Sequence, residues 1–239
     1  LLEGARNMDL HFRNNEFSDN IPVLMACLSL WYNNFFNYQT HAIIPYSENL
    51  KSFSKYLQQA SMESNGKQTD RSENLVDYET GQIIWGQTGT NAQHSFFQLL
   101  HQGSKVIPSD FIGFNNSIKG NKDHHDILMA NFFAQTKALM KGTKGEEVKS
   151  NHMLFKGDRP TNTILISKLT PASLGSLIAM YEHKIFTLGV ILNILSFDQF
   201  GVELGKKLAK NILKDIENQD FSEHDSSTKN LLNRYSSTG

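Results

Sequence analysis

The sequence predicts an α/β fold in which helices cover both faces of a parallel sheet. Short apolar runs alternate with longer segments of helical periodicity along most of the 239 residues. The runs at residues 42–46, 83–85 and 163–166 are continuously apolar, which is typical of strands that are buried on both faces. With 39% hydrophobic and 20% charged residues, the composition suits one sizeable buried core.

The first elements are helical. Residues 1–20 begin like the middle of a helix and without an initiator methionine, so we assign them to the end of a preceding helix and a linker. A buried helix is predicted at residues 21–36, where apolar and aromatic residues are dense. Asp19 or Asn20 can cap this helix, and Pro22 is tolerated in its first turn.

Strands and helices then alternate along the chain. The first strand, at residues 42–46, is closed by a proline and is followed by a helix at residues 50–60. Turn signals at residues 75–81, which are typical of a hairpin, precede the second strand at residues 83–85. A helix is predicted next, at residues 90–101.

The third strand is predicted at residues 106–112. Residues 113–123 are rich in Asn, Gly and Lys and indicate a solvated loop, which leads into a helix at residues 127–139. Residues 141–150 contain few apolar side chains and are predicted to be a linker.

The last part of the chain combines one strand with helices. The fourth strand, at residues 163–166, precedes a buried helix pair at residues 172–195 and an amphipathic helix at residues 202–216. We therefore expect one main domain at residues 21–210 and a C-terminal arm at residues 211–239.

Charge and cysteine content exclude several classes of function. Lys and Arg number 23 against 24 Asp and Glu, so the net charge of −1 provides no field that would concentrate nucleic acid or anionic lipid. No apolar run approaches the roughly 18 to 20 residues that cross a bilayer, and no signal segment opens the chain. The single cysteine, Cys27, excludes an internal disulfide, is expected to be buried, and fits a reducing cytoplasm best.

Candidate chemistry follows the first two strands. Ligands of α/β folds bind beyond the carboxyl ends of the strands, so Gln59, residues 62–67 and residues 86–94 are expected to meet at that edge of the sheet. The segment Gly86-Gln87-Thr88-Gly89-Thr90-Asn91-Ala92-Gln93-His94 can present backbone N–H groups to an anion, or it can be only a tight turn. It lacks the residues of a nucleotide-binding loop.

Single polar residues carry little information by pattern alone. Glu63 can be a solvated loop charge, His94 a core histidine and Lys206 a solvated residue on a helix face. His124, His125 and Asp126 resemble metal ligands only superficially, because adjacent residues on a helix point about 100° apart. No second ligand cluster accompanies them, and we predict no metal site.

Two runs of residues identify a resemblance. Met62-Glu63-Ser64-Asn65-Gly66-Lys67 and Phe197-Asp198-Gln199-Phe200-Gly201-Val202-Glu203-Leu204-Gly205-Lys206 resemble signature stretches of the glucose-6-phosphate isomerase family. Further similarity runs through Trp31-Tyr32-Asn33-Asn34-Phe35-Phe36, Gly89-Thr90-Asn91, Asn131-Phe132-Phe133-Ala134-Gln135-Thr136 and Tyr181-Glu182-His183-Lys184, so that essentially the whole chain is covered, as a carboxy-terminal portion of the family.

The resemblance implies a flavodoxin-like sugar-isomerase (SIS) domain and an enzyme that interconverts glucose 6-phosphate and fructose 6-phosphate through an enediol. It implies that Glu63 is the catalytic base, that His94 opens the sugar ring and that Lys206 is the active-site lysine. Gln59 and Gln199 match positions that contact the substrate. No metal or organic cofactor is implied. A cytoplasmic homodimer is expected, in which the C-terminal arm wraps the partner and His94 serves the neighbouring subunit's site.

The chain departs from the family pattern in two ways. Gln87-Thr88 stands where the family usually has Glu-Pro, and Ala92 where it has Gly. The family's upstream Gly-Gly-Arg motif and phosphate-binding Ser/Thr loop do not occur in these 239 residues, so we expect most phosphate contacts to be missing from this chain. Two alternatives therefore stay open: a non-catalytic module that binds sugar phosphates, and an inactive fragment.

Overall fold

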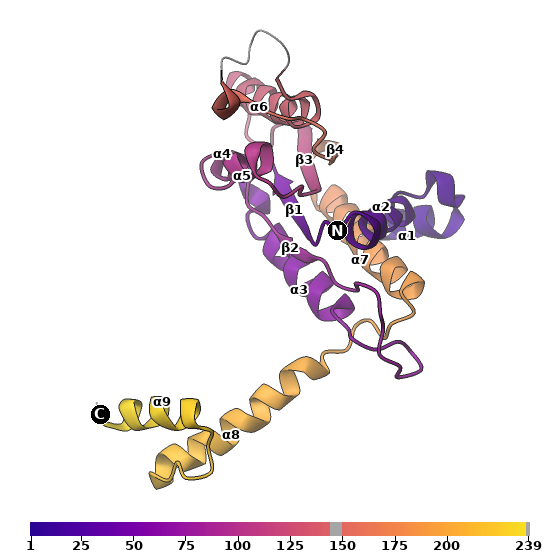
Figure 1. Ribbon diagram of the computed structural model, residues 1–239. Helices are drawn as coiled ribbons and strands as arrows, with labels where there is room; N and C mark the ends of the chain where they lie inside the picture. The colour runs from indigo at the N-terminus through magenta and orange to yellow at the C-terminus, as the bar shows by residue number, and fades with distance from the viewer. Residues whose placement is uncertain (144–149, 238–239) are drawn as a thin grey trace. The chain divides into compact units, whose positions relative to one another are not determined.

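The computed structural model describes residues 1–143 and 150–237 and divides into two compact units, Leu1–Phe197 and Asp198–Gly239 (Figure 1). The first unit is built on a parallel sheet of four strands in the order β2-β1-β3-β4. The strands are β1 (Thr40–Pro45), β2 (Ile83–Trp85), β3 (Ser109–Asn116) and β4 (Thr161–Lys168). This order matches the first four strands of a flavodoxin-like sheet, and the predicted α/β class is confirmed.

Helices cover both faces of this sheet. One face carries α2 (Ile21–Leu30), α3 (Phe53–Asn65) and α7 (Pro171–Ile191), with α1 (Leu2–Asn14) packed on α7. The other face carries α4 (Gly89–Gln93), α5 (Phe97–Gln102) and α6 (Lys122–Lys141). Short 3₁₀ turns lie at Phe17–Asp19, Glu48–Leu50 and Asn151–Met153.

Alternate residues of the central strands supply two apolar cores. In β1, Ile43 packs toward α3 and α7, whereas Ala42 and Ile44 pack toward α5 and α6. In β3, Ile112 packs in the core with α3 and α7, and Phe111 packs in the core with α5 and α6. Because both faces of these central strands are buried, their sequences are largely apolar, which is why their positions could be predicted.

The helix predicted at residues 21–36 is present, and of the two predicted caps, Asp19 and Asn20, the structure uses Asn20. Asn20 caps it by accepting a hydrogen bond from the Val23 N–H, and it ends in a π-helical turn, Trp31–Phe35. The prediction that Cys27 is buried is wrong, because Cys27 is exposed. The buried side of α2 consists of residues at helical spacing, namely Pro22, Met25, Ala26 and Ser29, and Cys27 lies off that stripe.

Four other predicted elements need correction. The helix at residues 90–101 is two helices, α4 and α5, which are interrupted at residues 94–96. The buried pair at residues 172–195 is one helix, α7, which begins at a Thr170–Ser173 capping box. Strand β3 extends through Asn116, into the predicted loop. The hairpin at residues 75–81 is reduced to one bridge between Thr69 and Leu75.

Two further predicted segments remain, the linker at residues 141–150 and the N-terminal segment at residues 1–20. Residues 144–149 of the predicted linker lie outside the described residues. The segment expected to end a preceding helix forms α1, which packs on α7 within the first unit.

The second unit is helical. It contains a 3₁₀ turn at Phe200–Val202, then α8 (Glu203–Asn218) and α9 (Ser226–Ser237). The first unit ends at Phe197, so α8 belongs wholly to the second unit. The expected boundary between main domain and arm, at residue 210, falls within α8. In the described part of the chain, no helix is both long and apolar enough to cross a membrane.

Candidate active site

The predicted base lies on a helix rather than in a loop. Helix α3 continues through Asn65, so Glu63 belongs to its last turn, and the backbone carbonyl of Glu63 accepts a hydrogen bond of 2.6 Å from Lys67 Nζ. Gln59 precedes Glu63 by one helical turn, and residues four apart lie on the same face of a helix. Both side chains are exposed. They therefore form a pair of polar groups presented by a regular element.

This helix places the pair at the opposite edge of the sheet from the one predicted. Helix α3 follows the carboxyl end of β1 and returns toward the amino end of β2, because β1 and β2 are parallel. Its last turn accordingly lies next to the segment that leads into β2, where the Lys67 carbonyl accepts a hydrogen bond from Thr80 Oγ1. The expectation that Glu63 meets residues 86–94 at the carboxyl edge is wrong.

The segment after β2 is a tight turn. Gly86 has φ +150°, and a Cβ on it would lie 2.0 Å from the carbonyl oxygen of Ile43. A Cβ on Gly89 would lie 2.2 Å from the Tyr46 ring. Close packing against β1 and the residue after it thus accounts for both glycines. Ala92 is fully buried beneath this turn, so the structure accommodates alanine there.

His94 is exposed at the end of α4, so it is not a core histidine. Its backbone N–H donates to the carbonyl of Asn91. The preceding Gln93 turns inward, where its Nε2 donates to Tyr46 Oη at 3.5 Å and to Asn131 Oδ1 at 3.3 Å. Since His94 follows the carboxyl end of β2 and Glu63 lies near its amino end, the first unit does not bring these two residues together.

Gln199 and Lys206 belong to the second unit. Gln199 is the residue before the 3₁₀ turn, and Lys206 lies in the first turns of α8, where its Nζ pairs with Glu203 Oε1 at 2.8 Å. Both side chains are exposed, and none of the α8 residues is fully buried within this unit. Within this unit Lys206 is exposed, as are the apolar Leu204 and Leu208 of the same helix.

His125 and Asp126 of α6 engage in other contacts, and His124 takes part in the helix cap through its backbone. The ring Nε2 of His125 lies 2.9 Å from the carbonyl oxygen of Phe114, and Asp126 pairs with Lys122. His124 contributes its backbone N–H to the cap of α6 by donating to Asn121. Among residues 1–143 and 150–237, no three His, Cys, Asp or Glu side chains are arranged to hold a metal ion.

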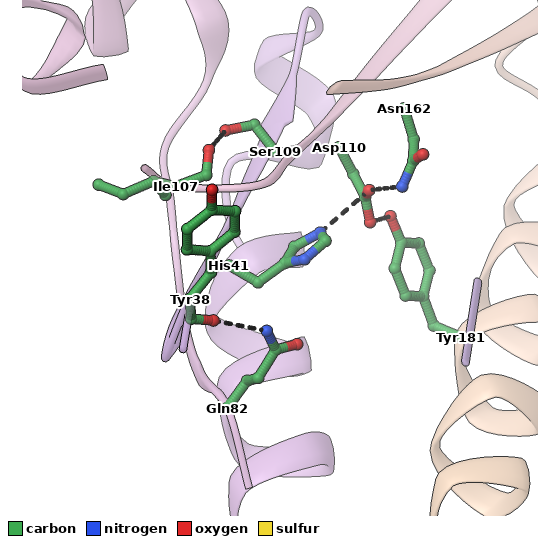
Figure 2. A network of polar contacts seen from close by, with 8 residues as sticks. All are labelled: Tyr38, His41, Gln82, Ile107, Ser109, Asp110, Asn162 and Tyr181. Carbon is green, nitrogen blue, oxygen red and sulfur yellow. Dashed lines mark hydrogen bonds and ion pairs between the residues drawn. The ribbon is translucent and has the colours of Figure 1, made fainter. Parts of the chain in front are cut away.

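A buried polar network, which sequence reasoning missed, lies at the amino edge of the sheet (Figure 2). Asp110 is completely buried, and its carboxylate accepts hydrogen bonds from Tyr181 Oη at 2.9 Å and Asn162 Nδ2 at 2.7 Å. His41 Nε2 lies 3.0 Å from the same carboxylate. The network joins β1, β3 and β4 to α7. A charged residue inside an apolar strand was the signal that could have revealed it.

The pKa values in this network shift in opposite directions. Burial alone would raise the pKa of Asp110, but the attraction of His41 and Lys184 and the hydrogen bonds from His41 and Asn162 outweigh it and hold the pKa well below its ordinary value. Burial lowers the pKa of Lys184, and the Asp110 charge partly opposes this. Burial, followed by the Asp110 charge, raises the pKa of Tyr181. The carboxylate is thus ionised at neutral pH.

Comparison with known proteins assigns relatives to the whole chain. The family model described as phosphoglucose isomerase matches residues 1–232. A glucose-6-phosphate isomerase from Christiangramia forsetii is 55% identical, with 99% of this chain and 47% of that protein covered. This chain therefore spans about half the length of that relative.

Solved structures also resemble this chain. The crystal structure of a glucose-6-phosphate isomerase from Chlamydia trachomatis matches with a TM-score of 0.87 and 39% identity, covering 100% of this chain and 46% of that chain. A hypothetical protein from Thermus thermophilus matches with a TM-score of 0.72 and 21% identity, covering 89% of this chain and 49% of that chain, and supports the fold alone.

Proposed function

Because the chain belongs to the phosphoglucose isomerase family, we propose that it provides the base-bearing part of an enzyme that interconverts glucose 6-phosphate and fructose 6-phosphate. The observation that carries this proposal is the C-terminal part of α3, where Glu63 in the last turn and Gln59 one turn earlier are exposed on the same face of a regular helix. A carboxylate held on a rigid element suits proton transfer, which depends on geometry first.

The proposed chemistry needs one base and hydrogen-bond donors. Glu63 removes the C2 proton of the open-chain sugar and returns it to C1, so that aldose and ketose interconvert through an enediol. His94 and Lys206 move protons on the ring oxygen and the C1 hydroxyl while the ring opens. Gln59 and Gln199 bind the substrate. The reaction requires no metal or organic cofactor, because hydrogen-bond donors stabilise the enediolate directly.

We also propose the setting of this reaction. The protein acts in the cytoplasm as a homodimer in glycolysis and gluconeogenesis, with residues 21–210 as a sugar-isomerase (SIS) domain and residues 211–239 as an arm around the partner. The separation of His94 from Glu63 within the first unit supports a site shared between two copies. The exposed apolar residues of α8, among them Leu204, Leu208 and Leu213, are consistent with such an interface.

A coupled assay tests the activity directly. Purified protein, with its intact mass determined, is supplied with fructose 6-phosphate, and formation of glucose 6-phosphate is followed through a dehydrogenase. We expect robust turnover from the full-length protein. A calorimetric titration that shows binding of fructose 6-phosphate, combined with no product, would instead favour a non-catalytic sugar-phosphate-binding module.

Mixing two inactive variants tests the shared site. Glu63→Gln and His94→Ala homodimers each lack one group in both sites, whereas a heterodimer has one site with both defects and one intact site. Random reassociation therefore restores about a quarter of the wild-type activity, because half of the dimers are mixed. The recovery is measured by the same assay after the variants are dissociated together and renatured. Mixtures that stay as inactive as the single variants would contradict the shared site.

A further inference from the structure

Asn65, the last residue of α3, is held by two hydrogen bonds to distant parts of the first unit. Its side chain is 2% exposed. Its Nδ2 donates to the carbonyl oxygen of Ile185 in α7 at 3.0 Å, and its Oδ1 accepts from Ser196 Oγ at 2.7 Å. A buried amide with both ends satisfied is fixed in orientation, since losing either partner would leave a buried polar group unpaired.

This side chain ties the end of α3 to the rest of the first unit. The last carbonyls of a helix have no intrahelical partners, and helix ends fray unless they are capped. After α3, Gly66 has φ −77° and ψ 72° rather than the left-handed conformation of a usual glycine cap, and its N–H bonds back to Met62. Within the described residues, the side-chain bonds of Asn65 therefore connect the final turn to the neighbouring helix.

Helix α7, which accepts the hydrogen bond from Asn65, is itself bonded to the sheet. Tyr181, one turn before Ile185, donates to the buried Asp110 of β3. Lys184 is buried next to Ile185 and, together with Asn65, lines a small cavity of about 20 Å³. A set of buried polar groups thus runs from β3 through α7 to Asn65. Glu63 is two residues away in the same turn.

We propose that Asn65 is a positioning residue that fixes the last turn of α3, and with it the carboxylate of Glu63, for proton transfer. The inference rests on the proposed isomerase function. Small displacements of a catalytic group are costly, because a misplacement of about 1 Å can reduce the rate about 100-fold. Ser196 contributes to the same positioning, since its hydroxyl donates a hydrogen bond to the oxygen of the Asn65 amide.

Asn65→Ala tests the inference by kinetics and by hydrogen exchange. We expect kcat for fructose 6-phosphate to fall by about 10- to 100-fold, with KM changed by less than about twofold, because the geometry of the transition state suffers more than substrate binding. Amide exchange at residues 62–66 should become faster, whereas residues 57–60 of the same helix keep their protection. The milder Ser196→Ala variant should also lower kcat and speed amide exchange at residues 62–66.

Tyr78→Phe is the matched control. Tyr78 Oη donates to the carbonyl of Leu192 at 2.6 Å, so this variant also removes a side-chain bond to the end of the α7 region, but from outside α3. It should lower the melting temperature less than Asn65→Ala does, because Tyr78 is exposed, and leave kcat within about twofold of the wild type. A folded Asn65→Ala protein with unchanged kcat, or with unchanged exchange at residues 62–66, would overturn the inference. If Asn65→Ala speeds exchange at residues 62–66 but the wild-type protein has no isomerase activity, the proposed function and the positioning role of Asn65 fail, whereas its structural tie to α7 stands.

Discussion

Replacing Glu63 by glutamine should reduce isomerisation by about 10²- to 10⁴-fold while leaving the fold intact, because the amide has the shape of the carboxylate but cannot accept the C2 proton. Glu63 is exposed on the last turn of α3, so the substitution should change the free energy of unfolding by less than about 0.5 kcal/mol. The measurements are kcat and kcat/KM for fructose 6-phosphate and the thermal unfolding midpoint.

Exchange of the substrate's C2 hydrogen with solvent provides a second readout. The base that forms the enediol also performs this exchange, so Glu63→Gln should lose both activities together. Glu3→Gln, which neutralises an exposed glutamate in the first turn of α1, is the matched control and should retain wild-type rates. Substantial turnover by correctly folded Glu63→Gln protein would remove Glu63 from the role of base.

The second large effect is expected at Asp110. Asp110→Asn should lower the free energy of unfolding by about 3–5 kcal/mol, because it removes the buried negative charge that faces His41 and Lys184 and leaves Lys184 buried without its counter-charge. Denaturant unfolding at neutral pH measures the loss. Asp126→Asn, which breaks an exposed pair with Lys122 in α6, is the control and should cost less than about 1 kcal/mol.

The same substitution should change the pH dependence of stability. The folded-state pKa of Asp110 lies below its unfolded value, so its contribution is complete above the unfolded pKa of about 3.9 and is lost as the pH falls from there through the folded pKa. Wild-type protein should therefore lose stability below about pH 4 more steeply than Asp110→Asn does. If the free energy of unfolding falls equally steeply with decreasing pH in the two proteins, or is equal at neutral pH, the network contributes little to stability.

Much of the fold could be predicted from local pattern. Strands β1, β2 and β4 contain short apolar runs, so their positions follow from composition alone. Helices α2, α6 and α8 follow from apolar spacing and from caps such as Asn20. The predictions were wrong where tertiary contacts override the local signal. The third strand was predicted at residues 106–112, whereas β3 is Ser109–Asn116, and the partners from β4 and α7 that satisfy the Asp110 charge were not foreseen.

The candidate residues came from signature runs, whereas their arrangement came only from the structure. Glu63 was expected in a loop at the carboxyl edge, but α3 extends beyond its predicted end at residue 60 to Asn65 and carries Glu63 to the amino edge. The last residue of that extension, Asn65, bonds to Ile185 and Ser196, which are 120 and 131 residues distant in sequence. No local periodicity contains information about bonds of that separation.

The sequence by itself therefore determined the α/β class, the core strands, most helices and the family signatures, because these depend on burial and spacing within a few residues. The tertiary structure decided the edge at which Glu63 is presented, the separation of His94 from it, and the buried network around Asp110. Each of these depends on hydrogen bonds and charges between segments far apart in the chain, and their free energies exist only once the elements have packed.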